Sequence, residues 1–303
     1  MRTIFFLSCF LGILFLFSCT KDKEQEDRLF QKIPSSRSDI HFENTLTDTP
    51  ELNILTYLYY YNGAGVAAAD FNGDGLTDLY FTANQTDDKL YLNQGELKFE
   101  EVTQQAKIDN GDGWTTGVTH VDINHDGRLD LYICKVGDYK NLQGRNLLYV
   151  NQGNDENGIP IFKEDAAPYG LDFSGFSTQS AFLDYDLDGD LDMFLLNHSV
   201  FPNRTYGKGS ERKQVDSLAG DRLFQNKNGK FVDVSSEAAI FQGNIGYGLG
   251  LGVGDLNNDG YPDIYVGNDF FENDYLYINQ KDGTFEEIIS KDNSKLGHTT
   301  HFS

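Results

Sequence analysis

Aspartate and asparagine side chains recur in four short segments, at the first, third, fifth and ninth of nine positions, with glycine at the sixth. Side-chain oxygens at this spacing in a tight loop suit a hard cation such as Ca²⁺, and glycine permits the sharp backbone turn. We predict one Ca²⁺ per segment, bound by those side chains and by the backbone carbonyl of the seventh residue. The four predicted ligand sets are Asp70, Asn72, Asp74, Leu76 and Asp78; Asp122, Asn124, Asp126, Arg128 and Asp130; Asp184, Asp186, Asp188, Asp190 and Asp192; and Asp255, Asn257, Asp259, Tyr261 and Asp263.

An EF-hand and a metal-free acidic turn both fit these loops less well. An EF-hand needs a bidentate glutamate at the twelfth position and a helix after the loop. Position twelve is instead Phe81, Ile133, Leu195 or Val266. In acidic turns without metal, the clustered carboxylates would repel one another and raise each other's pKa. Mg²⁺ is less favoured because it takes fewer protein ligands and retains waters. We expect Asp190, at position seven, to point its carboxylate outward.

The segments around the acidic loops repeat and predict short strands. In each repeat, one strand ends at the first Asp, a second follows the ninth, a third carries Leu-aromatic-x-Asn, and a fourth surrounds a phenylalanine. Four strands per repeat of about 50 residues are typical of β-propeller blades. We therefore predict an all-β fold, a β-propeller of four-stranded antiparallel blades, with about four blades present and the ring incomplete. The predicted first strands are 65–69, 117–121, 180–183 and 250–254; the phenylalanines are Phe99, Phe162, Phe231 and Phe285.

The N-terminal segment has the features of an export signal. Arg2 precedes an almost wholly apolar run that is too short for a comfortable transmembrane span. Residues 16–19 (Leu-Phe-Ser-Cys) resemble the lipobox of bacterial lipoproteins, which implies cleavage before Cys19 and lipidation of its thiol; the alternative is an ordinary signal peptide. The predicted domains are a lipoprotein signal peptide (1–19), a flexible, charged tether (20–40) and the propeller repeats (41–303). The predicted location is the bacterial outer membrane, exposed at the cell surface and attached by the lipid only.

Charge and cysteine content limit the partners. The chain has 47 acidic and 24 basic residues, a net charge of −23, which argues against nucleic acid or an anionic membrane surface as the main partner. Cys9 and Cys19 lie in the N-terminal apolar stretch, so no disulfide is available to the mature chain, and Cys134 is predicted to be a small core residue.

Catalytic motifs are absent from the sequence or unconvincing. The six histidines do not have the His-Glu-x-x-His spacing of a metal site. The Gly-rich run 248–252 precedes a strand and an acidic loop instead of a helix, so we reject a dinucleotide site. Trp114 and the pairs Tyr59-Tyr60 and Phe270-Phe271 are predicted to pack in the core or rim; a carbohydrate surface at Trp114 is the alternative.

The pattern Asp-x-Asn/Asp-x-Asp-Gly-x-x-Asp, within repeats of this length, resembles the FG-GAP/VCBS repeats of integrin α-subunit propellers and of many bacterial surface proteins. Residues 61–66 and 267–277 extend the resemblance to the cartilage-acidic-protein-like group of VCBS lipoproteins. Members of that group often carry more repeats and a C-terminal ASPIC/UnbV domain. Because residues 296–303 resemble the lead-in to another acidic loop, we expect a fragment of a longer protein from Bacteroidetes.

Two classes of function follow from these observations. The favoured one is a surface-anchored, calcium-binding propeller that acts as a protein- or glycan-binding module, with structural calcium and no catalysis. The alternative is the propeller portion of a secreted polysaccharide lyase or hydrolase, because fold alone does not exclude an enzyme. A basic and aromatic cluster around Arg204, Lys208, Arg212 and Lys213 would favour the enzyme. A quinone-dependent dehydrogenase is disfavoured because its tryptophan-docking repeats are missing.

Overall fold

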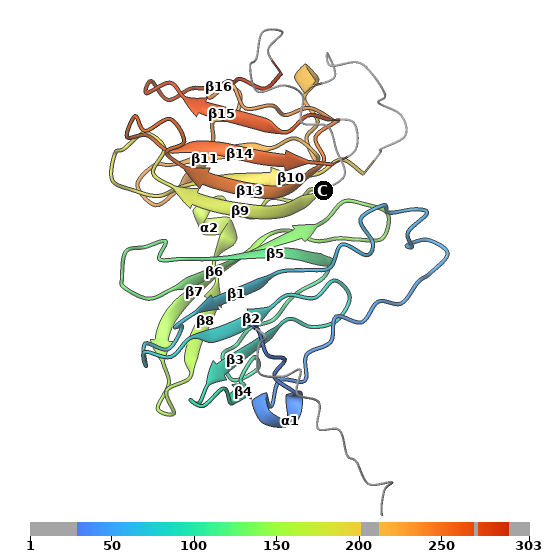
Figure 1. Ribbon diagram of the computed structural model, residues 1–303, viewed down its shortest axis with the longest axis vertical. Coiled ribbons are helices and arrows are strands. Elements are labelled where there is room, and N and C mark those ends of the chain that lie inside the picture. Colours follow the sequence, from blue (N-terminus) through green and yellow to red (C-terminus); the bar gives the residue numbers. More distant parts are fainter. Residues whose placement is uncertain (1–28, 201–211, 270–271, 291–303) are drawn as a thin grey trace, which may run out of the picture.

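Four antiparallel sheets make up the computed structural model, which describes residues 29–200, 212–269 and 272–290 (Figure 1). Each sheet has four strands that pair in chain order, so each is one propeller blade. Blade 1 contains β1 (Val66–Ala69), β2 (Asp78–Phe81), β3 (Lys89–Asn93) and β4 (Phe99–Glu101); blade 2 contains β5 (Trp114–Val121), β6 (Asp130–Val136), β7 (Leu147–Asn154) and β8 (Pro160–Glu164). Blade 3 contains β9 (Ser177–Leu183), β10 (Asp192–Asn197), β11 (Arg222–Asn226) and β12 (Phe231–Asp233); blade 4 contains β13 (Gly248–Gly254), β14 (Asp263–Asn268), β15 (Tyr275–Asn279) and β16 (Phe285–Glu287).

This architecture confirms the predicted fold class. Every strand expected from the repeat pattern is present, and α-helix in the described residues is limited to two single turns, α1 (Ser35–Ser38) and α2 (Ala166–Tyr169). The four sheets follow one another without closing a ring among the described residues, as predicted for an incomplete propeller (Figure 1). Neither of these helices is long and apolar enough to cross a membrane.

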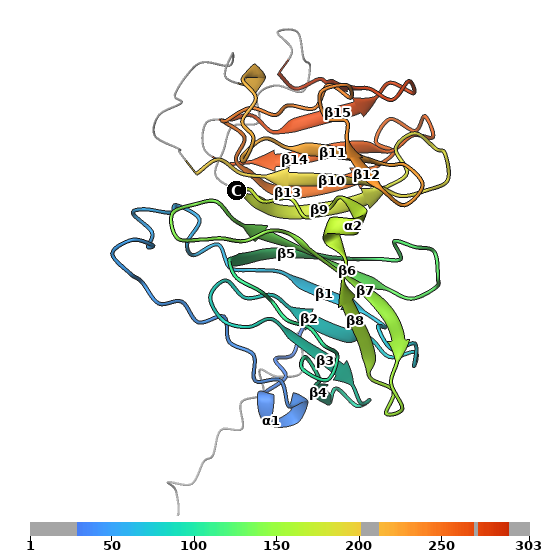
Figure 2. The same ribbon diagram turned by 180° about the vertical axis from the view of Figure 1, so that it is seen from behind.

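The core between blades is built by the second strand of each blade, whose side chains point alternately to the two faces of the blade. Successive side chains of a strand point to opposite faces, so one strand contributes to two interfaces. Tyr80 of β2 is buried against Leu131 and Ile133 of β6, while Tyr132 of β6 faces blade 3. The same arrangement joins blades 3 and 4. Helix α2 lies beside the junction of blades 2 and 3 (Figure 2), and the predicted core residue Cys134 is buried in that junction.

An aromatic cap, defined here as Tyr57, Tyr59, Tyr60 and Trp114, covers the ends of the blades at which the first strands begin. The first three residues come from the segment before β1, and they pack against side chains of blades 2, 3 and 4. A hydrogen bond of 3.0 Å joins the Tyr57 hydroxyl to Nε2 of His198, 141 residues away in sequence. Tyr59, Tyr60 and Trp114 are all at most 5% exposed, which confirms that they are packed residues.

Several predictions fall outside the described residues. These are the signal peptide (1–19), the lipidated Cys19, residues 20–28 of the tether, Arg204, Lys208 and Phe270-Phe271. The part of the tether that is described contains α1, and contacts with blade 1 follow at His41, whose backbone N–H donates to the Tyr91 hydroxyl, and at Phe42, whose ring stacks on Phe81.

Candidate metal centres and a pocket at the aromatic cap

The four acidic loops share one backbone shape. Each joins the first and second strands of its blade and has left-handed backbone at positions four and six. Glycine occupies position six in every copy, with φ of 96° at Gly189, as expected for a sharp turn. In the third loop, the two oxygens of Asp184 accept the backbone N–H groups of Asp188 and Gly189, each at 3.1 Å. Equivalent bonds form in the other three loops and place the acidic side chains around one point.

The third loop gathers the most negative charge. One ligand oxygen from each of Asp184, Asp186 and Asp188 lies within 4.8 Å of the others. Position three is asparagine in the other loops, where its amide donates to the position-five carboxylate. These bonds are Asn72 to Asp74 (3.1 Å), Asn124 to Asp126 (2.9 Å) and Asn257 to Asp259 (3.0 Å). The third loop therefore carries one more charge at the point where the ligand atoms meet.

The carboxylate of Asp190 does not point outward, so that prediction is wrong. Its Oδ1 atom is buried and has no hydrogen-bond partner in the described part of the chain, and the same holds for Oδ1 of Asp186. Burial, followed by the negative charges of Asp188, Asp186 and Asp184, raises the pKa of Asp190. Because the chain turns back at Gly189, the side chain at position seven is brought beside the carboxylates it was expected to avoid.

The ninth-position carboxylates hold the loops to the sheets. All four are at most 1% exposed. In blade 3, Asp192 accepts the N–H of Tyr185 (3.2 Å) at one oxygen and the N–H of Asn226 (2.8 Å) at the other. Burial raises the pKa of Asp192 to about 7, although both backbone bonds oppose this shift. Each carboxylate oxygen has a second lone pair, so metal ligation by these four residues stays a prediction.

The asparagine of the Leu-aromatic-x-Asn motif has a role that the sequence did not suggest. Asn279 ends β15, and its amide nitrogen donates to the carbonyls of Pro262 (3.3 Å), in the acidic loop of its own blade, and Tyr185 (2.8 Å), in the acidic loop of the previous blade. Asn151 makes the same pair of bonds, to Leu129 and Phe71. These asparagines connect an acidic loop to its neighbour around the ring.

A polar residue, called here the clamp residue, holds together the other end of the hairpin formed by the second and third strands. It is the residue just before the third strand: Asp88, Asn146, Asp221 or Asp274. Asp221 accepts the N–H of Asn197 at 2.9 Å, and burial raises its pKa to about 8. These residues were not predicted from the sequence, although each repeat has an Asp or Asn two residues before the leucine of the Leu-aromatic pair in the third strand.

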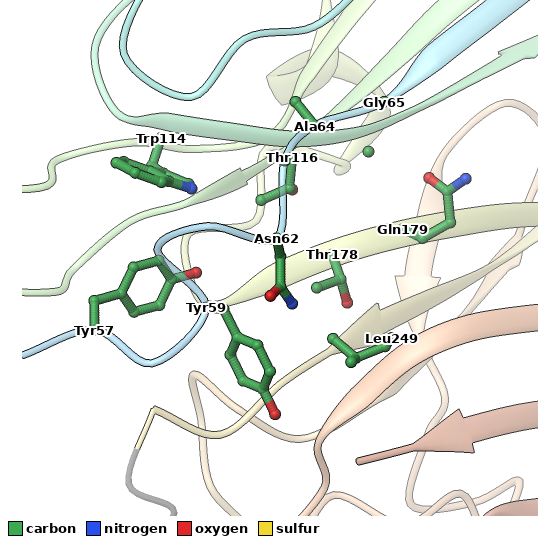
Figure 3. Close-up of a pocket in the computed structure, with 12 residues that line it drawn as sticks. Tyr57, Tyr59, Asn62, Ala64, Gly65, Trp114, Thr116, Thr178, Gln179 and Leu249 are labelled. Carbon is green, nitrogen blue, oxygen red and sulfur yellow. The ribbon is translucent and has the colours of Figure 1, made fainter. Parts of the chain in front are cut away.

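A pocket of about 360 Å³ opens beside the aromatic cap (Figure 3). Its walls come from residues 57–65, which lead into β1, and from the beginnings of β5, β9 and β13, so blades 2, 3 and 4 and the segment before blade 1 contribute. The acidic loops follow the other ends of these first strands. The pocket and the acidic loops are therefore separate sites, at opposite ends of each first strand.

The basic cluster that would favour a polysaccharide-degrading enzyme is described only in part. Arg212 forms an ion pair with Glu272, a carboxylate that is largely buried. Its guanidinium is thus already paired within the protein, and Lys213 beside it is exposed.

The blades and their loops agree with a comparison to known families. Residues 70–133, 214–266 and 255–302 match the FG-GAP-like repeat family and together make up just over half of the chain. The chain belongs to this family and is a β-propeller-like module.

Individual relatives match parts of the chain. Cartilage acidic protein 1 of Homo sapiens is 28% identical over 137 residues, which cover 44% of this chain and 20% of that protein. Integrin alpha-PS5 of Drosophila melanogaster is 36% identical over 83 residues, 24% of this chain and 8% of that protein. A solved structure of an Agrocybe aegerita lectin that recognises non-reducing terminal N-acetylglucosamine has a TM-score of 0.38 and 17% identity, over 73% of this chain and 50% of that chain. The matched segments span no more than about a fifth of these two relatives in length.

Proposed function

We propose that this protein is a propeller module held at a bacterial surface by a lipid on Cys19, where it binds a protein or glycan partner. In this proposal each acidic loop binds one Ca²⁺, and the metal is structural. The observation that carries the proposal is the four-fold recurrence of one loop geometry, with oxygen side chains at the same positions in every blade.

The donor set fits calcium. Every side chain at positions one, three, five and nine offers oxygen, which a hard cation prefers. In the third loop, the two buried oxygens without hydrogen-bond partners among the described residues, on Asp186 and Asp190, would gain from a nearby positive charge. Position-one, position-three and position-five side chains would hold the metal together with the position-seven carbonyl. The metal would offset the carboxylate repulsion and fix the turn between the first and second strands.

Removing calcium is expected to destabilise the fold. EDTA should lower the melting temperature, and excess Ca²⁺ should restore it, because the loop carboxylates would otherwise repel one another. Asp188→Ala should lower the calcium stoichiometry measured by titration calorimetry by one ion per chain. Asp87→Ala, at an exposed aspartate outside the loops, should leave the stoichiometry unchanged. Equal melting curves with EDTA and with Ca²⁺ would contradict the calcium assignment.

Partner binding is tested separately from the metal. The purified chain, presented to arrayed glycans and to arrayed cell-surface proteins, should be retained by a restricted subset in the presence of Ca²⁺. Retention should fall with EDTA, because the blade edges would lose their order. A calcium-loaded chain that is retained on neither array would refute the binding function and leave the calcium assignment standing.

A further inference from the structure

We infer that the pocket beside the aromatic cap binds a single neutral sugar residue. This inference rests on the proposed function in its glycan form and assigns a site to it. The pocket is built from three blades and the segment before β1, so it exists only in the assembled module (Figure 3).

The size of the pocket suits a small ligand. Its volume of about 360 Å³ lies near the lower end of the range of small-molecule sites. Gly117 lets β5 approach β9 closely at the pocket wall, because a Cβ atom there would lie 2.2 Å from Oε1 of Gln179 and 2.3 Å from the carbonyl of Thr178. One pyranose ring is a better match than a helix or an extended peptide.

The chemistry of the walls favours an uncharged ligand. None of the lining residues is Asp, Glu, Lys, Arg or His. A cationic ligand would find no carboxylate in the pocket to pair with. An anionic ligand would find no basic side chain there, and the chain's net charge of −23 would repel it. Leu249, which is half-buried, supplies apolar surface against which the C–H face of a sugar ring can pack, while the rings of Tyr59 and Trp114 line the pocket as packed residues (Figure 3).

Two amide side chains provide the hydrogen-bonding capacity. Oε1 of Gln179 is buried without a partner in the described part of the chain. The exposed side chain of Asn62 makes no hydrogen bond to any described residue. The Tyr57 hydroxyl, by contrast, is already bonded to His198. Amides both donate and accept, as sugar hydroxyls do, so a hydroxyl of the ligand would satisfy the Gln179 oxygen.

The only tryptophan of the chain, Trp114, lines this pocket and provides the measurement. Neutral methyl hexosides, titrated into the full calcium-loaded chain, should change tryptophan emission in a saturable way. An acidic sugar, glucuronate, should not. Gln179→Ala and Asn62→Ala should each weaken binding about 10-fold, the effect of one lost hydrogen bond. Gln152→Ala, at an exposed glutamine on blade 2, should bind like the unaltered chain.

Three outcomes would overturn the assignment. The first is no saturable change with any neutral hexoside. The second is unweakened binding in both Gln179→Ala and Asn62→Ala; because Asn62 is exposed and its side chain has no bond to a described residue, its substitution tests the site even where Gln179→Ala does not fold. The third is tighter binding of an acetylated amino-acid amide than of every sugar, which would point to a protein partner. Glycan-array retention that survives Gln179→Ala would place the glycan elsewhere and leave the proposed function intact.

Discussion

Aspartate has two different roles within the nine-residue loop of each blade, and the role of each side chain depends on whether it is exposed or buried. Asp188 is exposed and available to a metal, whereas Asp192, four residues later, is buried and accepts backbone N–H groups at both oxygens. The two carboxylates have the same chemistry. Because β10 begins at Asp192, the ninth position lies inside the sheet, while the fifth lies on the loop.

Asp221 should make stability depend on pH. Its pKa is about 8 in the fold and 3.8 in the unfolded chain, so between these values the folded protein holds a proton that the unfolded chain has released. Its contribution to the unfolding free energy is therefore complete below about pH 4 and decreases as pH rises toward 8, by about 1.4 kcal/mol per pH unit. Asp221→Asn should reduce the measured slope by this amount in urea unfolding at pH 5, 6 and 7, and leave the part that comes from other buried carboxylates such as Asp192.

Blade 2 supplies a natural precedent for that substitution, because Asn146 fills the equivalent position and accepts the backbone N–H of Lys135 at 2.7 Å. The exposed Asp87 provides a matched control, and Asp87→Asn should keep the slope of the unaltered chain. A slope in Asp221→Asn equal to that of the unaltered chain would show that Asp221 is ionised in the fold.

At the scale of the element, each blade is a hairpin of second and third strands fastened at both ends. One end carries the ninth-position Asp and the motif asparagine, and the other carries the clamp residue before the third strand. The asparagine also reaches the adjacent blade at two of the interfaces, through Asn151 and Asn279. A change in the acidic loop of blade 1 or blade 3 is therefore expected to alter the hydrogen bonds of the blade that follows it.

Asn279→Ala should be costly because it breaks bonds within and between blades. Asn279 is 3% exposed, and its amide nitrogen donates to Pro262 and Tyr185 while its oxygen accepts the N–H of Lys281. Loss of these bonds in a buried site should lower the free energy of unfolding by ~2–3 kcal/mol in urea denaturation. The exposed neighbour provides a control, since Gln280→Ala should change it by less than about 0.5 kcal/mol. Equal effects of the two substitutions would be inconsistent with an interblade role.

For the whole molecule, blade 4 differs from the others on the face that would meet a following blade. Tyr265 is 36% exposed and Leu256 is 55% exposed. Their equivalents in blade 1, Tyr80 and Phe71, are at most 2% exposed because blade 2 covers them. Blade 4 thus presents apolar side chains on a face that no further sheet covers among the described residues.

The aromatic cap is expected to unite the four blades, and Tyr57→Phe tests this. The substitution removes the hydroxyl that bonds His198, whose Nδ1 atom already has no partner among the described residues. Leaving a buried histidine without its bond should cost ~1–3 kcal/mol in unfolding free energy. Tyr61→Phe removes a hydroxyl from a ring that is 59% exposed, and should cost less than about 0.5 kcal/mol. A smaller effect of Tyr57→Phe than of Tyr61→Phe would argue against the cap.

The sequence by itself determined the strands, the blade class and the acidic loops. These features are encoded within continuous segments, because a nine-residue loop, its glycine and the alternation beside it act through neighbours in the chain. The outward direction expected of Asp190 was wrong because the loop turns back at Gly189 and brings this side chain beside the other carboxylates of the loop, a path that the spacing of residues alone does not show.

Only the tertiary structure decided which residues connect the blades. Tyr57 and His198 are 141 residues apart, and Asn279 reaches a carbonyl 94 residues earlier. The pocket likewise joins Asn62, Trp114, Gln179 and Leu249, one from each repeat or its lead-in. No periodicity in the sequence brings these residues together. Stacking of the blades does so, because each blade buries its apolar face on the next and thereby fixes which loop ends meet.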